Sequence, residues 1–236
     1  MSTYIYAITA GDHPARLDGL EAVGASGSLR TVAGRSQKAV VSDAPPELRA
    51  KRRDLVAHQA VLERLLEDGS ALPMRFGLVA PDEQAVVAAL DENTEGYAQS
   101  LEQLHGRVEY NLKATRDQDD LLREIVAESE EVRQLNEATR ENPAAQDNKV
   151  ALGELIAREV EQREGREAGA LVDALAPAAV GNVPGAPVDG HFVNVSFLVD
   201  RTRAKDFTDV VQAEADRRGA AYELKLNGPL PPYSFV

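Results

Sequence analysis

Histidine is the residue type in this chain that could most directly do acid–base or metal chemistry near neutral pH. The chain has four: His13, His58, His105 and His191. They stand singly in different predicted elements, and no two are spaced to share one face of a helix. The chain has no cysteine, which excludes a thiolate metal site and a cysteine nucleophile. Each histidine is therefore expected to be a packed or surface residue, and no metal site is predicted.

Motifs that bind phosphate or activate water are absent from the sequence. It contains no glycine-rich loop of the form GxxxxGK[ST] or GxGxxG and no HExxH pair of zinc ligands. Adjacent acids such as Asp119 and Asp120 fall in a strongly charged helical segment, where a solvated face is the ordinary arrangement. No catalytic residue and no cofactor are predicted, and an enzyme is the least favoured class of function.

The C-terminal segment 227–236 concentrates residue types that bind other proteins. Directly after a predicted strand it carries Pro229, Pro231, Pro232, Tyr233 and Phe235. Because proline fixes φ, the segment is expected to be stiff and extended and to lose little entropy on ordering. Two interpretations remain open and can hold together: the aromatic residues pack on the protein's own core, or they form an exposed recognition strip. These five residues are the candidate partner-binding residues.

Composition places the chain among globular proteins. It has 236 residues, 43% hydrophobic and 28% charged, which suits one large domain or two small ones. The 26 basic and 39 acidic residues give a net charge of −13, which repels nucleic acid and anionic lipid. No nucleic-acid or membrane partner is expected. The lack of cysteine, of a signal-like start and of an apolar run of membrane-spanning length predicts a cytoplasmic protein.

Hydrophobic periodicity predicts an α+β domain over residues 1–105. The expected elements are a strand at 3–9, a hairpin of strands at 29–32 and 38–42, a helix at 47–68, a strand at 72–79 and a helical run at 82–104 with a break at 93–96. The apolar face of the first helix includes Leu55, Val56 and Leu62. This order of elements resembles a ferredoxin-like unit with one helix reduced or replaced.

Residues 106–236 are predicted to form a second α+β domain. Its expected elements are a strand at 107–115, an antiparallel helical hairpin at about 117–175, a loop at 176–190, a strand at 191–199 buried on both faces, a helix at 206–218, a closing strand at 222–227 and the proline-rich tail. The hairpin has a narrow apolar stripe on each side of a break at Asn142 and Pro143, which is typical of two helices that pack antiparallel. Most of the excess acid lies on its outer faces.

Several blocks of residues together resemble the gas vesicle protein L/F family. The blocks are YIYAI at 4–8, His58 and Gln59 followed by LPMRFG at 72–77, GRVEY at 106–110, VSFLV at 195–199 and GPLPPYSF at 228–235. They span the chain in order, and the last is the most specific. Leu230 departs from the pattern, because relatives often carry an aromatic residue there.

The resemblance implies a non-enzymatic accessory protein of gas vesicle assembly, located in the cytoplasm or at the gas vesicle. It implies a ferredoxin-like N-terminal domain and an α+β C-terminal domain with a coiled-coil hairpin. The implied partners are the small, hydrophobic, aggregation-prone shell protein and other accessory gas vesicle proteins. We expect the C-terminal domain and its tail to bind the shell protein and to keep it from aggregating. The alternative is a ferredoxin-like regulatory module that binds a small ligand.

Overall fold

The computed structural model describes residues 1–25, 27–142 and 146–236. Its contacts divide the chain into two compact units. Unit 1 comprises Met1–Glu109, Asp200–Thr202 and Gly228–Val236, and unit 2 comprises Tyr110–Val199 and Arg203–Asn227. The tail therefore belongs to unit 1, whereas the sequence analysis assigns it to the domain at 106–236. Periodicity places elements along the chain, but it does not show which core an apolar tail will contact.

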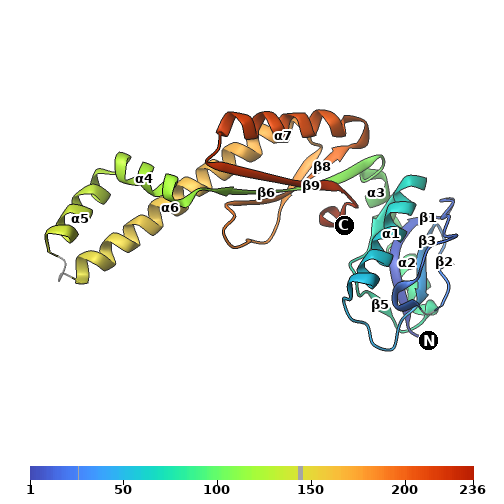
Figure 1. The fold of residues 1–236 in the computed structure, drawn as a ribbon. Helices are drawn as coiled ribbons and strands as arrows, with labels where there is room; N and C mark the ends of the chain where they lie inside the picture. The colour runs from blue at the N-terminus through green and yellow to red at the C-terminus, as the bar shows by residue number, and fades with distance from the viewer. Residues whose placement is uncertain (26, 143–145) are drawn as a thin grey trace. The chain divides into compact units, whose positions relative to one another are not determined.

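The sheet of unit 1 is antiparallel (Figure 1). Its strands are β1 (Thr3–Ala10), β2 (Arg30–Ala33), β3 (Gln37–Asp43), β4 (Ala71–Pro73) and β5 (Val79–Ala80). The order is β2-β3-β1-β4, and β5 also pairs with β1. The strand predicted at 72–79 is divided into β4 and β5. A turn separates them at Gly77, whose φ of +99° is a conformation that glycine adopts readily.

The helices of unit 1 follow the predicted order. They are η1 (Val23–Ala25), α1 (Arg52–Asp68), α2 (Glu83–Glu92) and α3 (Thr94–Gln103). The helix predicted at 47–68 begins only at Arg52. Its buried face differs from the prediction. The polar side chains of Asp54 and His58 are buried and hydrogen-bonded, while Leu55 and Val56 are exposed. A buried polar side chain is acceptable when it is hydrogen-bonded, and periodicity alone does not register such bonds.

Unit 2 is built on a second sheet, of order β7-β8-β6-β9. Its strands are β6 (Arg107–Arg116), β7 (Gly181–Pro184), β8 (Val193–Asp200) and β9 (Tyr222–Leu230). Residues 107–109, 200 and 228–230 of these strands are counted with unit 1. β8 is buried along almost its whole length, as its apolar run predicts. The sequence predicts only a loop at 176–190, but β7 lies within it and pairs antiparallel with β8. Its glycine and proline ordinarily indicate a loop, so the sequence pattern does not predict this strand. Both residues are tolerated at a sheet edge.

The other regular elements of unit 2 are helices. They are α4 (Gln118–Glu128), α5 (Glu130–Glu141), α6 (Gln146–Leu175), η2 (Ala176–Ala178), η3 (Arg201–Arg203), which begins in unit 1, and α7 (Ala204–Arg218). α7 contacts α6. It also packs on β8, where the ring centroids of Phe197 and Phe207 lie 5.3 Å apart. In the described ranges, no helix is both long and apolar enough to cross a bilayer.

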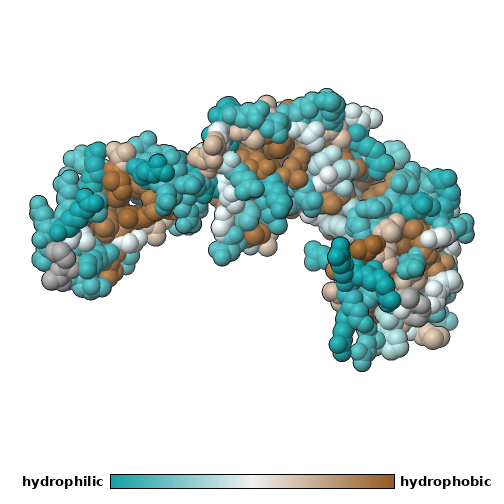
Figure 2. Space-filling view, in the orientation of Figure 1, coloured by the Kyte–Doolittle hydropathy of each residue, from teal (hydrophilic) through white to brown (hydrophobic). Residues whose placement is uncertain are grey.

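We call α4, α5 and α6 the helical arm. α4 and α5 run outward and α6 returns beside them (Figure 1). The arm buries Leu121, Ile125, Val132 and Leu155 in its seam, where Figure 2 shows hydrophobic side chains between hydrophilic outer faces. The sequence predicts one helix up to 141, but Ser129 ends α4 and caps α5 by accepting the Val132 N–H. Pro143, predicted to break the hairpin, lies outside the described residues.

Candidate partner-binding site

The C-terminal tail, Gly228–Val236, packs on unit 1. Pro231 and Pro232 are buried, and Tyr233–Phe235 form the turn η4 rather than an extended strip. Tyr233 packs against the core cluster that contains Tyr4, and its hydroxyl donates to Gln59 Oε1 over 3.3 Å. Its burial raises its pKa to about 12. The tail thus packs on the protein's own core, as one interpretation expects, with Pro229 exposed and Phe235 half-buried.

Glu109 fixes the tail from the first half of β6. Its side chain is buried, and its two carboxylate oxygens accept the Ser234 N–H over 2.8 Å and the Ser234 hydroxyl over 2.7 Å. Hydrogen bonds to an ionised acceptor are stronger than neutral ones. Glu109 is a positioning residue. In the sequence analysis it appears only within the GRVEY block and is not a candidate site residue. Its partner Ser234 lies 125 residues further along the chain, so no local sequence pattern indicates this contact.

Replacing Glu109 with Ala is expected to release the tail. Ser234 loses both bonds to the carboxylate, and each hydrogen bond to a charged group contributes about 1.5–3 kcal/mol. The amides of Ser234 and Phe235 should therefore exchange at least about tenfold faster with deuterium. Glu102→Ala, at an exposed glutamate of α3, is the control. Unchanged exchange in the Glu109 variant would show that other contacts hold the tail.

Tyr233 also forms one wall of an open hollow of about 640 Å³ on unit 1. The opposite wall is the outer face of α1, which contributes Leu55, Val56 and Ala60. Phe76, from the turn between β4 and β5, lines it as well. Two elements far apart in the sequence, α1 and the tail, therefore form one mostly apolar surface.

An aromatic cluster supports the floor of this hollow. His58 Nε2 lies 3.0 Å from the Met74 carbonyl, so Nε2 carries the proton and Nδ1 accepts from the Tyr4 hydroxyl over 2.9 Å. The His58 ring stacks on Tyr6 with centroids 5.4 Å apart. Burial lowers the pKa of His58 and raises that of Tyr4, so both side chains are neutral near pH 7. The cluster is structural.

Another hollow on unit 1, of about 750 Å³, contains a serine–histidine contact. Ser70 Oγ lies 2.9 Å from His105 Nδ1, the kind of pair that can activate a serine. In the described part of the chain, no carboxylate hydrogen-bonds to the other nitrogen of His105. His13, in the same hollow, is held between the Leu65 carbonyl and the Ala15 N–H. Within the described ranges, no three histidine or acidic side chains are grouped to hold a metal.

The chain is thus a two-unit α+β protein with a docked tail and an open, mostly apolar hollow on unit 1. The chain belongs to the Gas vesicle synthesis protein GvpL/GvpF family, whose family model matches residues 2–236. This confirms the resemblance found in the sequence. "Gas vesicle protein F" of Streptomyces sp. (strain CB03234) is 41% identical over 238 residues, covering 100% of both chains. "Gas vesicle protein L" of the same strain is 28% identical, covering 99% of this chain and 92% of that one.

Solved structures of the same family share the fold. The gas vesicle protein GvpF from Anabaena sp. PCC7120 has a TM-score of 0.86 at 22% identity, covering 99% of this chain and 97% of that chain. GvpF from Microcystis aeruginosa has a TM-score of 0.80 at 22% identity, covering 99% and 98%. The mixed helix-and-sheet class predicted from the sequence is thereby confirmed.

Proposed function

We propose that this protein is an accessory protein of gas vesicle assembly that binds the small hydrophobic shell protein and keeps it from aggregating. Other accessory gas vesicle proteins are its further partners, its place is the cytoplasm or the gas vesicle, and its role is not enzymatic. Family membership over residues 2–236 supports the gas vesicle context. The observation that carries the binding step is the apolar hollow between α1 and Tyr233. The tail keeps the part expected from the sequence, but the rest of this surface comes from residues 52–76 and not from the domain at 106–236.

The physical basis is the mismatch in solubility between the two partners. A shell subunit that excludes water carries a large apolar surface, which aggregates unless it is covered. This chain has a net charge of −13, which favours solubility, and it has an apolar surface that can cover part of such a subunit. The complex would remain in solution until the subunit polymerises.

We also propose that the architecture implied by the resemblance holds in detail. The antiparallel order β4-β1-β3-β2 supports a ferredoxin-like unit 1, with the described residues between β1 and β2 (11–25 and 27–29) in the place of its first helix. The buried seam of the helical arm supports a coiled-coil hairpin. That the chain has two domains that fold separately and divide near residue 106 is a proposal of the same kind, with the tail packed on the first of them.

Replacing both Tyr233 and Phe235 with Ala is expected to weaken binding of the shell protein by at least about 1–2 kcal/mol, because aromatic residues supply much of the energy of interfaces. The measurement is co-expression with the shell protein, followed by sedimentation and quantification of the soluble complex. Phe192→Ala, at a partly buried aromatic of unit 2, is the matched control.

Thermal unfolding must accompany this measurement, because Tyr233 also packs on the core of unit 1. A folded double variant that binds the shell protein fully would show that the contact lies elsewhere. A chain that binds a small molecule saturably and forms no shell-protein complex would favour the regulatory alternative.

A further inference from the structure

The helix α1 has apolar residues at the centre of the face that it turns to solvent. Leu55 is 43% exposed and Val56 is 61% exposed, and Ala60 lies one turn further on. Charged residues stand before and after them, at Arg52 and Glu63. The exposed face of a surface helix is ordinarily polar throughout. This face is therefore better suited to contact with another apolar surface than to water.

Two hollows flank the ridge that Val56 and Ala60 form. The first, of about 640 Å³, extends to Tyr233 in the tail. The second, of about 500 Å³, extends to Leu20 in the segment before η1. Arg52, Val56 and Ala60 line both hollows. A ridge between two hollows is a shape that interdigitates with the side chains of a second segment.

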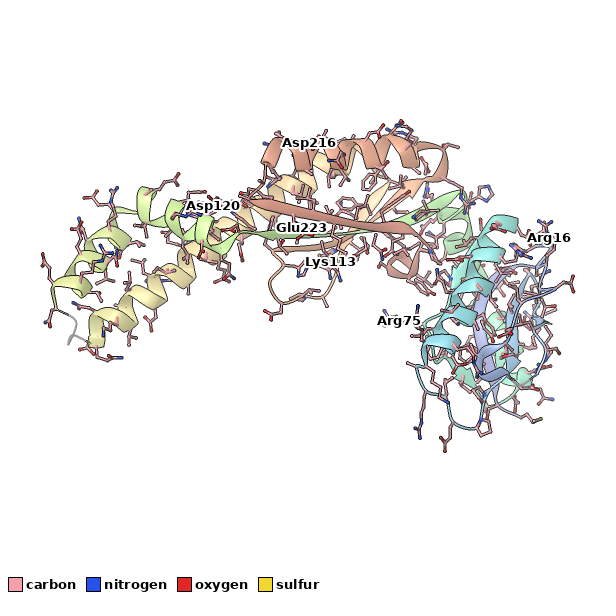
Figure 3. The ribbon with its side chains drawn as sticks, in the orientation of Figure 1. Arg16, Arg75, Lys113, Asp120, Asp216 and Glu223 are labelled. Carbon is pink, nitrogen blue, oxygen red and sulfur yellow. The ribbon has the colours of Figure 1, made fainter. Side chains whose placement is uncertain are left out.

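Positive charge borders these hollows, although the chain as a whole is acidic. Arg52 and Arg75 line the first hollow, and Arg53 lines the second. Among the described residues, neither Arg52 nor Arg75 forms an ion pair, and Figure 3 shows Arg75 standing clear of the ribbon. Glu63 is the acid of the first hollow, and Glu21 lines the second, where Arg53 is paired with Asp54. Arginines without an acidic partner at an apolar rim are complementary to carboxylates on a binding partner.

We propose that the α1 surface, defined as Arg52, Leu55, Val56, Ala60, Arg75 and Tyr233, binds an amphipathic segment of the shell protein in which carboxylates flank apolar residues. This inference rests on the proposed function and deepens it by naming the surface and the chemistry of the segment. The apolar side chains enter the two hollows, and the carboxylates pair with the two arginines. A second copy of this chain is the less suitable occupant, because two chains of charge −13 repel each other.

The test is co-expression of the full chain with the shell protein, followed by sedimentation at low and high salt. Arg52→Glu combined with Arg75→Glu is expected to reduce the soluble complex at least about tenfold at low salt, because like charges then face each other. Salt should weaken the wild-type complex by screening the attraction, whereas in this variant it screens a repulsion and should restore part of the complex. Arg133→Glu combined with Arg140→Glu, on the helical arm, changes the net charge equally and should leave binding unchanged.

Val56→Ser tests the apolar part without changing the charge. Val56 is 61% exposed in the free chain, so thermal unfolding should be unaffected. The complex should weaken about fivefold, as expected for losing the burial of that exposed part of two methyl groups. If the wild-type chain forms no complex, the proposed function itself fails. If the complex forms and both surface variants match the wild type, only the α1 surface is overturned. If the variants instead abolish self-association of the chain alone, a second copy is the occupant and the proposal is wrong.

Discussion

Replacing Tyr6 with Ala is expected to lower the free energy of unfolding of unit 1 by about 3–5 kcal/mol, the usual range for deleting a buried aromatic ring. Tyr6 is fully buried in β1, with its ring centroid 4.8 Å from that of Tyr4 and 5.4 Å from that of His58. Removing the ring leaves a cavity beneath the hollow that α1 and Tyr233 line. The measurement is native-state hydrogen exchange of the amides in β1 and β3, which isolates unit 1 from unit 2.

Tyr6→Phe separates the contribution of the hydroxyl to stability from that of the ring. The hydroxyl accepts the Val23 N–H over 2.8 Å and lies 3.1 Å from Ser42 Oγ. Phenylalanine keeps the ring but leaves the Val23 N–H without this acceptor, so a loss of about 1–3 kcal/mol is expected. Equal losses in the two variants would contradict the assignment of most of the effect to packing. The amides of β8 in unit 2 serve as the internal control.

Replacing Arg116 with Met is expected to destabilise unit 2 by about 2–3 kcal/mol. Arg116, at the end of β6, has a side chain that is 4% exposed and pairs with Glu124 on α4 and Glu167 on α6. Its guanidinium also lies 5.1 Å from the centre of the Tyr222 ring on β9. Breaking a buried ion pair costs about 3–5 kcal/mol. The smaller value is expected here because both glutamates are partly exposed.

The effect of Arg116 should depend on pH. Its hydrogen bond to Glu124 holds the pKa of that carboxyl below its ordinary value of 4.5. A carboxyl with a lowered pKa in the folded state stabilises the protein above its unfolded pKa and loses this contribution as the pH falls through its folded pKa. The difference between wild type and Arg116→Met is therefore full at pH 7 and shrinks below about pH 4.5. Asp120, labelled in Figure 3 and 3.5 Å from Arg116, belongs to the same group of acids.

Arg163→Met is the matched control for this prediction. Arg163 on α6 shares Glu124 with Arg116, but its other partner, Glu128, is 62% exposed, and an exposed pair contributes only about 0–1 kcal/mol. A smaller loss than in Arg116→Met is therefore expected. Hydrogen exchange of the α4 amides, measured from pH 7 to pH 4, follows both variants. A loss in Arg163→Met as large as that in Arg116→Met would show that the arginine on β6 has no special part in holding the helical arm.

Elements with a strong local pattern could be predicted from the sequence. The apolar run of β8 identifies a strand buried on both faces, and Asp82 marks the start of α2, where its side chain accepts the Ala85 N–H. Other features depend on contacts with distant parts of the chain. β7 is recognisable only by its pairing with β8. Leu55 and Val56 show that periodicity finds the apolar residues of a helix without showing which of them the fold will cover.

The candidate site also combines residues that could be predicted with features that depend on distant contacts. Its five tail residues could be named from proline and aromatic content, but the structure buries Pro231 and Pro232 and leaves Pro229 exposed. The hollow could not be predicted, because it joins Gln59 to Tyr233, which is 174 residues away. Arg52 and Arg75 were not among the candidates. A single arginine has no local signal until the structure shows that no acid pairs with it.

The assignment of residues 228–236 to unit 1 has a consequence for how the protein is made. Unit 1 opens the chain, yet one of its parts is translated after all of unit 2. A nascent chain can fold N-terminal segments during synthesis, but the wall of the hollow that contains Tyr233 has not yet been synthesised at that stage. The surface that we assign to the shell protein is therefore complete only on a chain that has been translated through Tyr233. Shorter translation products carry the α1 wall but lack the Tyr233 wall, so they should bind the partner less tightly than the longer chain.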